Sequence, residues 1–95
     1  MLKVSVLYPS SDGSTFDMDY YQQKHKPLVL EVLGCERFEI DKGVDGPYMA
    51  VGHLFFESME KMQAGMAGPR AGEAMADVAN FTNVQPAMQV SEIVE

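Results

Sequence analysis

The chain has 95 residues and a mass of 10.5 kDa, which predicts a single domain, residues 1–95, whose small core would gain stability from a partner subunit. Its net charge of −7 repels phosphate backbones and anionic lipids, so neither nucleic-acid binding nor membrane-surface binding is expected. Because the sequence has no long apolar run, no signal-type segment and a single cysteine, we expect a soluble, cytoplasmic protein without a disulfide framework.

The first predicted element is a strand over residues 2–8, where apolar side chains occupy every second position. It ends at Pro9, and residues 10–14, which are rich in turn formers, follow it. Either Thr15 or Asp17 can then cap the helix that comes next.

That helix is predicted over residues 16–34, and it carries a histidine at the centre of its apolar stripe. Pro27 lacks an N–H, so the carbonyl of Gln23 loses its usual partner and we expect a kink or break near residues 23–27. Gly34 supplies the C-terminal stop. A step of about 100° per residue places these side chains together on the inward face: Met18, Tyr21, His25, Leu28, Val29, Val32 and Leu33.

Two strands follow, over residues 35–41 and 48–56, and a glycine-containing turn at residues 42–47 joins them. The second of these strands is apolar on both faces and has Gly52 in its middle. A mid-strand glycine lets another group approach the backbone closely.

The last third of the chain predicts a second, broken helix and a final strand. Ser58 caps the helix, glycines and Pro69 interrupt it, and helical character resumes over residues 70–79. The final strand is predicted over residues 84–94, where Pro86 favours a sheet edge or a bulge.

The resulting order, β-α-β-β-α-β, predicts an α+β, ferredoxin-like fold with a four-stranded antiparallel sheet and two helices on one face. Two helices leave the other face of the sheet uncovered, although its strands carry apolar residues there as well. An exposed apolar face on a small domain usually marks an interaction surface. We therefore expect a homodimer that forms through this sheet face.

Several segments in chain order resemble the EthD family, which belongs to the dimeric α/β barrel superfamily. They are Leu7-Tyr8-Pro9, the helix Phe16…Tyr20-Tyr21…His25-x-Pro27-Leu28, Gly34, Pro47-Tyr48, Leu54-Phe55-Phe56 with Ser58-Met59-Glu60, and Ala76-Asp77-Val78-Ala79-Asn80-Phe81-Thr82. The resemblance covers nearly the whole chain and implies a dimeric α/β barrel with a cavity between sheet and helices in each subunit.

The resemblance also implies a range of functions. The family is named for a protein needed in bacterial degradation of ethyl tert-butyl ether. Its superfamily includes cofactor-free cyclases and monooxygenases, dehydratases, isomerases, haem-dependent enzymes and binding proteins. We therefore expect an enzyme or auxiliary that acts, without a cofactor, on a hydrophobic aromatic or polyketide-like carbonyl compound by proton transfer or oxygenation. The alternative is a non-catalytic binding or accessory protein of a degradation pathway.

His25 is the candidate catalytic residue, because an imidazole in an apolar pocket can act as a general base. Tyr8 or Tyr48, at strand ends, could then polarise an oxygen of the ligand. The structural alternative is that His25 only bonds the backbone carbonyl freed near Pro27. The candidate substrate-binding residues are Tyr8, Tyr21, Tyr48, His53 and Phe56.

Two further side chains leave alternatives open. His53 could share the cavity with His25 or lie at the dimer interface, and Arg70 could meet an anionic ligand or remain solvated. No metal site is expected, because the histidines and the cysteine show no ligand spacing. The absence of a carboxylate close to a histidine in the sequence favours the binding-protein alternative.

Overall fold

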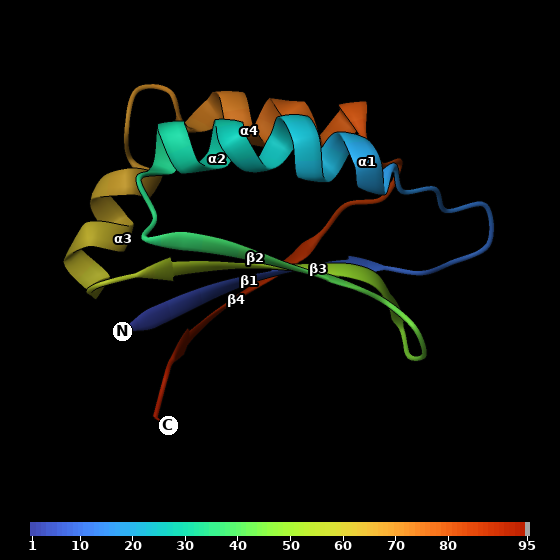
Figure 1. Ribbon diagram of the computed structural model, residues 1–95, viewed down its shortest axis with the longest axis horizontal. Coiled ribbons are helices and arrows are strands. Elements are labelled where there is room, and N and C mark those ends of the chain that lie inside the picture. The colour runs from blue at the N-terminus through green and yellow to red at the C-terminus, as the bar shows by residue number, and fades with distance from the viewer. Residues whose placement is uncertain (95) are drawn as a thin grey trace.

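The computed structural model describes residues 1–94, so Glu95, the last residue of the predicted domain, lies outside the described part of the chain. The elements are β1 (Leu2–Pro9), α1 (Met18–Tyr20), η1 (Tyr21–His25), α2 (Lys26–Leu33), β2 (Arg37–Lys42), β3 (Tyr48–Phe56), α3 (Met59–Met66), α4 (Ala71–Asp77), η2 (Val78–Asn80) and β4 (Ala87–Glu92). Four strands form one antiparallel sheet in the order β2-β3-β1-β4, and the long helices lie over one of its faces (Figure 1). The predicted four-stranded antiparallel sheet with helices on one face is therefore confirmed.

The core lies between the sheet and the helices. β1 and β3 are the central strands, and their even-numbered residues point towards the helices, where the side chains are largely buried. Alternation along a strand sends its odd-numbered residues to the other face. The core is formed by Val4, Tyr8, Tyr21, Val29, Leu33, Cys35, Phe38, Ala50, Leu54, Phe56, Met62, Ala74 and Phe81.

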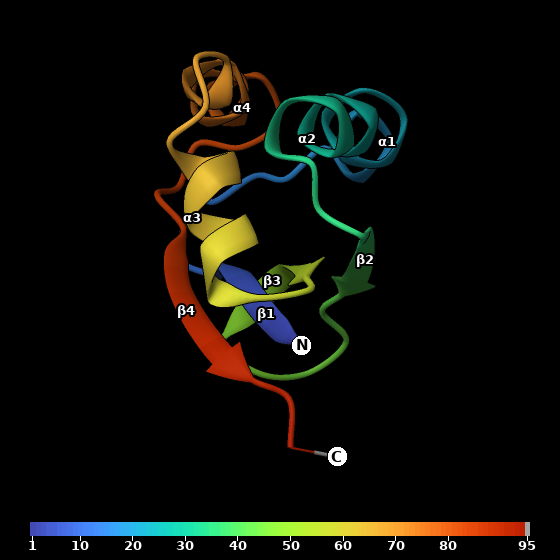
Figure 2. The ribbon, with the colours of Figure 1, turned by 90° about the vertical axis from the view of Figure 1, so that its left-hand side faces the viewer.

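The other face of the sheet carries no helix in the part of the chain that the structure describes (Figures 1 and 2). Leu7 and Val51 are partners across β1 and β3 on this face, and Phe55 is paired with Lys3. The guanidinium of Arg37 lies 4.0 Å from the centre of the Phe55 ring and covers it. This face therefore combines an apolar middle with charged residues from β2.

The predicted first helix is continuous, and the irregularity expected near residues 23–27, a kink or a break, is a π-helical turn, η1, at Tyr21–His25. The N–H of Lys26 donates to the carbonyl of Tyr21, five residues earlier, and Pro27 follows within the first turn of α2. The π turn changes the hydrogen-bond pattern just before Pro27, so the helix does not need an N–H at this residue and continues through the proline.

The helix ends are those that the sequence indicates. The Asp17 carboxylate accepts from the N–H of Tyr20, so Asp17 and not Thr15 is the N-cap of the first helix. Gly34 ends the helix in the left-handed region at φ 67°. Ser58 caps α3 through the N–H of Lys61.

Several predicted boundaries were wrong by a few residues. β2 begins at Arg37, because Cys35 is still part of the connection from the helix end. The second helix is broken as predicted, into α3 and α4, and its last residues form a 3-10 turn. β4 begins at Ala87, after Pro86, and is an edge strand, as the proline favoured.

Within residues 1–94, none of the helices has the length and apolar character that crossing a membrane requires.

Candidate functional site

A cleft of about 970 Å³ lies between the sheet and the helices, bounded by α2 and α4 on one side and by β1 and β4 on the other. Its walls are mainly aliphatic, and the half-exposed Met88 and the more exposed Met75 are among the residues that line it. The polar lining side chains are few. Three of them, Tyr8, Tyr21 and His25, come from the predicted candidate residues.

His25 forms a short, buried contact with a carboxylate at the wall of this cleft. Its Nδ1 lies 2.8 Å from Oδ2 of Asp77, and the side chains of His25 and Asp77 are only 6% and 11% exposed. The two residues are separated by 52 positions in sequence and come from η1 and the end of α4. The imidazole also lies against Phe81, with ring centres 4.6 Å apart.

The Asp77 carboxylate accepts from three groups. Besides His25, the Tyr20 hydroxyl donates to Oδ1 at 2.6 Å, and Nδ2 of Asn80 donates to the same oxygen at 2.9 Å. Burial alone would raise the pKa of Asp77, but the hydrogen bonds from Tyr20, Asn80 and His25 hold that pKa below its usual value of 3.8. Asp77 is therefore a carboxylate at neutral pH.

Burial lowers the pKa of His25 below its ordinary value of 6.5, and this effect outweighs the opposing hydrogen bond and charge of Asp77. His25 is therefore neutral at pH 7. A carboxylate only accepts hydrogen bonds, so the single imidazole proton must lie on Nδ1. Nε2 then has a free lone pair, and it forms no hydrogen bond within the described residues.

Two phenols lie next to the imidazole. The Tyr21 ring stacks on the His25 ring, with centres 5.3 Å apart and planes at 16°, and Tyr8 meets Tyr21 edge-on at 5.6 Å. The Tyr21 hydroxyl lies over Gly52, where a Cβ would overlap it. The predicted close approach at this mid-strand glycine is thus made by Tyr21.

Burial raises the pKa of Tyr8 to about 12. Burial, and then the neighbouring Tyr8, raise the pKa of Tyr21 well above its ordinary value of 10.0. Both side chains are therefore neutral phenols at physiological pH. Neutral phenols can donate hydrogen bonds to an oxygen of a bound molecule.

Residues 80–83 fix this side of the cleft to the loop before α1. The Thr82 hydroxyl donates to the carbonyl of Thr15 at 2.6 Å, and Asn83 accepts from the N–H of Thr15 and donates to the carbonyl of Gly13. Phe81 packs beside His25 and Tyr21. The segment between Asp77 and β4 is therefore fixed to the loop before α1 by hydrogen bonds from the Thr82 and Asn83 side chains to that loop's backbone.

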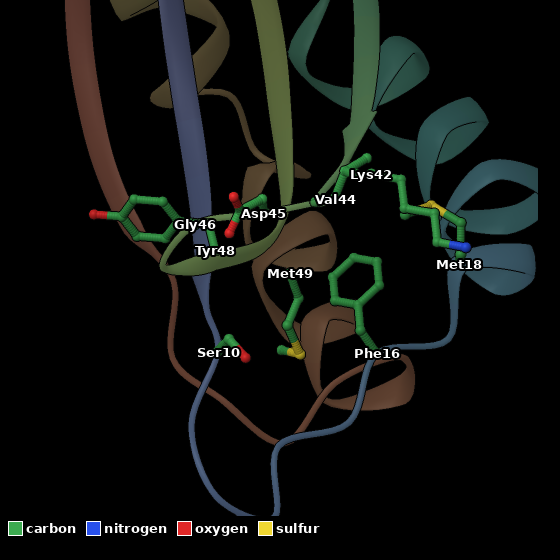
Figure 3. A pocket seen from close by; sticks show the side chains of 10 residues that line it. Ser10, Phe16, Met18, Lys42, Val44, Asp45, Gly46, Tyr48 and Met49 are labelled. Atoms are coloured by element: carbon green, nitrogen blue, oxygen red, sulfur yellow. The ribbon is translucent and has the colours of Figure 1, made fainter.

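Tyr48 does not reach this cleft. It is half-exposed and borders a separate groove of about 380 Å³ between the β2-β3 turn and the loop after β1. Figure 3 shows its ring directed away from Phe16 and Met49, which line the same groove. The structure therefore does not place Tyr48 as a partner of His25.

His53 and Phe56 also lie apart from His25. His53 is on the uncovered face of the sheet, where its Nε2 contacts Asp41 at 2.7 Å and its Nδ1 contacts the Ser5 hydroxyl at 3.4 Å. Of the two alternatives for His53, its position on this face excludes a cavity shared with His25, because successive strand residues point to opposite faces. Phe56 is buried in the core and does not line the cleft.

Two expectations about polar partners are corrected. The partner of His25 is the Asp77 carboxylate and not a backbone carbonyl near Pro27. The irregular part of the helix forms its own backbone hydrogen bond, from the N–H of Lys26 to the carbonyl of Tyr21. No carboxylate lies close to His25 in the sequence, which favoured the binding-protein alternative, but the fold brings Asp77 to it from 52 positions away. Arg70 is occupied at the surface by Glu73 at 2.8 Å and by Glu31 at 3.4 Å.

Asp77 is a candidate site residue that reasoning from the sequence did not assign. A signal was present, since Asp77 begins the Asp-x-x-Asn-Phe-Thr segment on which the resemblance partly rests. That segment supplies the carboxylate, the amide that bonds it, the ring beside the imidazole and the hydroxyl that ties the loop.

Solved structures share this arrangement of strands and helices. An EthD-like protein of Ralstonia eutropha JMP134 superposes with a TM-score of 0.90 at 34% identity, over 99% of this chain and 92% of that one. An EthD family protein of Bacillus halodurans C-125 gives 0.78 at 17% identity, over 99% of both chains. A dimeric protein of Bacteroides fragilis with a ferredoxin-like fold gives 0.61 at 9% identity, over 97% and 94%, which shows a shared fold alone.

Similarity in sequence is more specific. An uncharacterized 11.0 kDa protein in the thcB-thcC intergenic region of Rhodococcus erythropolis is 35% identical over an alignment of 89 residues, which covers 87% of this chain and 85% of that protein. The EthD domain matches residues 13–85, a range that includes η1, α2, α4 and both members of the His25–Asp77 pair. The chain therefore belongs to the EthD domain family.

Proposed function

We propose that this protein is a small enzyme that moves a proton on a hydrophobic carbonyl compound bound in the cleft, without a cofactor, with His25 as the general base. The observation that carries the proposal is the buried His25–Asp77 pair. His25 lines an apolar cleft, and its Nε2 remains free of hydrogen bonds from the described residues. A neutral imidazole held in one tautomer by a carboxylate is suited to accept a proton from a weak carbon acid.

In this mechanism Nε2 of His25 takes a proton from the carbon next to the carbonyl group. The electron pair of the broken C–H bond forms a carbon–carbon double bond, and the carbonyl electrons move to its oxygen, giving an enolate. Asp77 stabilises the imidazolium that results and keeps its Nδ1–H oriented. Return of the proton to the same carbon or to another one completes exchange or isomerisation.

Oxygenation of the bound compound, the other reaction expected for such a cleft, begins with the same step. An enolate is the electron-rich form of a carbonyl compound, and its formation by His25 precedes attack on dioxygen as it precedes isomerisation. Loss of the base would therefore remove both reactions.

The proposed assembly is a homodimer of single domains, residues 1–95, that forms through the uncovered sheet face as a dimeric α/β barrel. The apolar middle of this face, with Leu7, Val51 and Phe55, supports the proposal. Replacing Val51 with Lys should convert the dimer to a monomer in analytical ultracentrifugation. A wild-type protein that sediments as a monomer at all concentrations would contradict the proposed assembly.

Proton transfer can be measured without knowing the natural substrate. α-Tetralone is a largely apolar ketone with exchangeable protons next to its carbonyl, and their replacement by deuterium in deuterium oxide is followed by NMR. The wild type should accelerate this exchange, and His25→Asn should remove the acceleration, while the matched variant His53→Asn should keep it. Equal rates for the wild type and His25→Asn, in folded proteins, would remove His25 from catalysis.

A non-catalytic binding or accessory function in a degradation pathway is the second candidate. It is favoured by the low number of polar groups in a cleft of this size. Native mass spectrometry of the purified protein, followed by release of any bound molecule, separates the two. Tight binding of an unaltered molecule together with no exchange activity would support the second candidate.

A further inference from the structure

The Tyr21 hydroxyl is buried beside the Tyr8 hydroxyl and has no well-formed hydrogen bond. Tyr21 is 0% exposed, and among the residues that the structure describes its oxygen alone is a fully buried side-chain polar atom with no partner. An unsatisfied buried hydroxyl is unfavourable, by roughly 1–3 kcal/mol in general. The Tyr8 hydroxyl beside it is itself a donor, so the oxygen of a bound molecule can serve both hydroxyls as an acceptor.

The Tyr21 hydroxyl belongs to a side chain that lies directly against the proposed base, His25. The Tyr21 ring stacks on His25, and Tyr8 lies at its edge, so two phenols and one imidazole gather on the same side of the cleft. The remaining wall is mainly aliphatic. A bound molecule that offers one oxygen here would meet donors and base together.

The cleft is also uncharged. None of its described lining residues is Asp, Glu, Lys or Arg, and the nearby Arg70 is held by Glu31 and Glu73. Transfer of a carboxylate or phosphate into such surroundings is costly, because no opposite charge replaces its hydration. Neutral ligands do not bear this cost.

We propose that the cleft selects uncharged, largely apolar molecules that carry a carbonyl or hydroxyl oxygen, and that Tyr21 binds this oxygen with Tyr8 as a second donor. This proposal rests on the proposed function of the same cleft and names the substrate class. When His25 removes the proton, the negative charge develops on the bound oxygen. A preorganised phenol donor then strengthens its hydrogen bond in the transition state.

Three probes with one bicyclic frame test this selection: α-tetralone, the hydrocarbon tetralin, and tetralin carboxylate. Titration of the wild type at neutral pH should show α-tetralone binding about tenfold more tightly than tetralin, as one added hydrogen bond allows. The carboxylate should bind more weakly than either. Tyr21→Phe should lower the affinity for α-tetralone towards that for tetralin, with Tyr8 as the remaining donor, and should leave the affinity for tetralin unchanged.

Tyr48→Phe is the matched control, because Tyr48 lies outside the cleft, and it should change neither affinity. Should Tyr21→Phe fail to fold, the ratio of the two affinities in Tyr8→Phe decides the question, and a reduced ratio is expected there. An unchanged ratio in the folded variant, tighter binding of the carboxylate, or no binding of α-tetralone by the wild type would overturn the proposal.

The outcome is distinguishable from failure of the proposed function. A lost preference for the ketone in Tyr21→Phe, combined with exchange that is independent of His25, would leave the oxygen site and remove the base. Exchange that depends on His25, combined with an unchanged preference for the ketone in Tyr21→Phe, would retain His25 as the base and remove Tyr21 as the oxygen site.

Discussion

The two histidines of this protein each contact a carboxylate, and they lie on opposite faces of one sheet. The Nδ1 of His25 is 2.8 Å from Asp77, and the Nε2 of His53 is 2.7 Å from Asp41. The distances are nearly equal, but the surroundings differ. Asp77 is 11% exposed and accepts from two further donors, whereas Asp41 is 65% exposed.

The ring nitrogens also differ in what remains free. Both nitrogens of His53 have partners, since Nδ1 contacts the Ser5 hydroxyl. His25 uses only Nδ1 and keeps the lone pair of Nε2. A histidine–carboxylate distance alone thus says little about chemistry. Burial of the pair, the number of donors on the carboxylate and the free nitrogen separate a candidate base from a surface contact between histidine and carboxylate.

The largest difference between the two pairs should come from neutralising each carboxylate. Asp77→Asn leaves one acceptor oxygen for three donors and no charge to stabilise the imidazolium, so deuterium exchange into α-tetralone should slow by roughly a hundredfold. Asp41→Asn, on the other face, should leave the rate unchanged. Equal losses in the two variants would show that the faces do not differ in function.

A methyl group added at Gly52 should disturb the helix-covered face of the sheet and leave the uncovered face unchanged. In Gly52→Ala the new Cβ would overlap the Tyr21 hydroxyl and lie 3.2 Å from the Phe38 ring. The free energy of unfolding should therefore fall by about 1–3 kcal/mol. Gly72→Ala, where nothing lies within 4 Å, is the control and should be neutral or stabilising. Urea denaturation gives the energies. NMR should show altered signals for His25 and unaltered ones for His53.

Removing one of the additional donors on Asp77 should have a smaller effect. Tyr20→Phe deletes the 2.6 Å hydrogen bond to Oδ1, which weakens the hold of the carboxylate on the imidazole and should slow exchange by about threefold to tenfold. The pH dependence of the rate should shift as well, which a purely structural role of Tyr20 would not cause. Tyr48→Phe should preserve both rate and pH profile.

The smallest effect concerns stability as a function of pH. Because the pKa of His25 is lower in the folded chain than its ordinary 6.5, only the unfolded chain binds the proton between these two values. The free energy of unfolding should therefore fall as the pH drops below 6.5, and Asp77 should add a similar fall only near and below 3.8.

Urea denaturation between about pH 7 and about pH 5 measures the histidine contribution. His25→Asn should flatten the decline, and His53→Asn should retain it. A decline that is unaltered in His25→Asn would show that another group carries the pH dependence.

Much of the fold could be predicted, because it depends on local patterns. Alternation gave the bounds of β3, capping side chains gave the starts of the first helix and of α3, and Gly34 and Pro86 marked a helix end and an edge strand. Strand ends were less accurate, because pairing with a neighbour, and not the pattern alone, decides where β2 and β4 begin.

The site could be predicted only in part, because its contacts join distant residues. The inward direction of His25 followed from helical periodicity. Its pairing with Asp77, 52 residues away, depends on how α4 lies beside the first helix, which no spacing in the sequence encodes. Tyr48 was misplaced for a related reason: a strand end can face either groove, and only the surrounding loops decide which.

The π-helical turn at Tyr21–His25 also has an evolutionary meaning. A π turn is equivalent to one residue inserted into an α-helix, so a relative that is one residue shorter here could form an ordinary helix. Such a relative could retain the Asp17 cap and the Gly34 end but would lose the present stacking of a phenol on the imidazole. A gap between these two positions in an alignment would therefore divide the family by the architecture of its site.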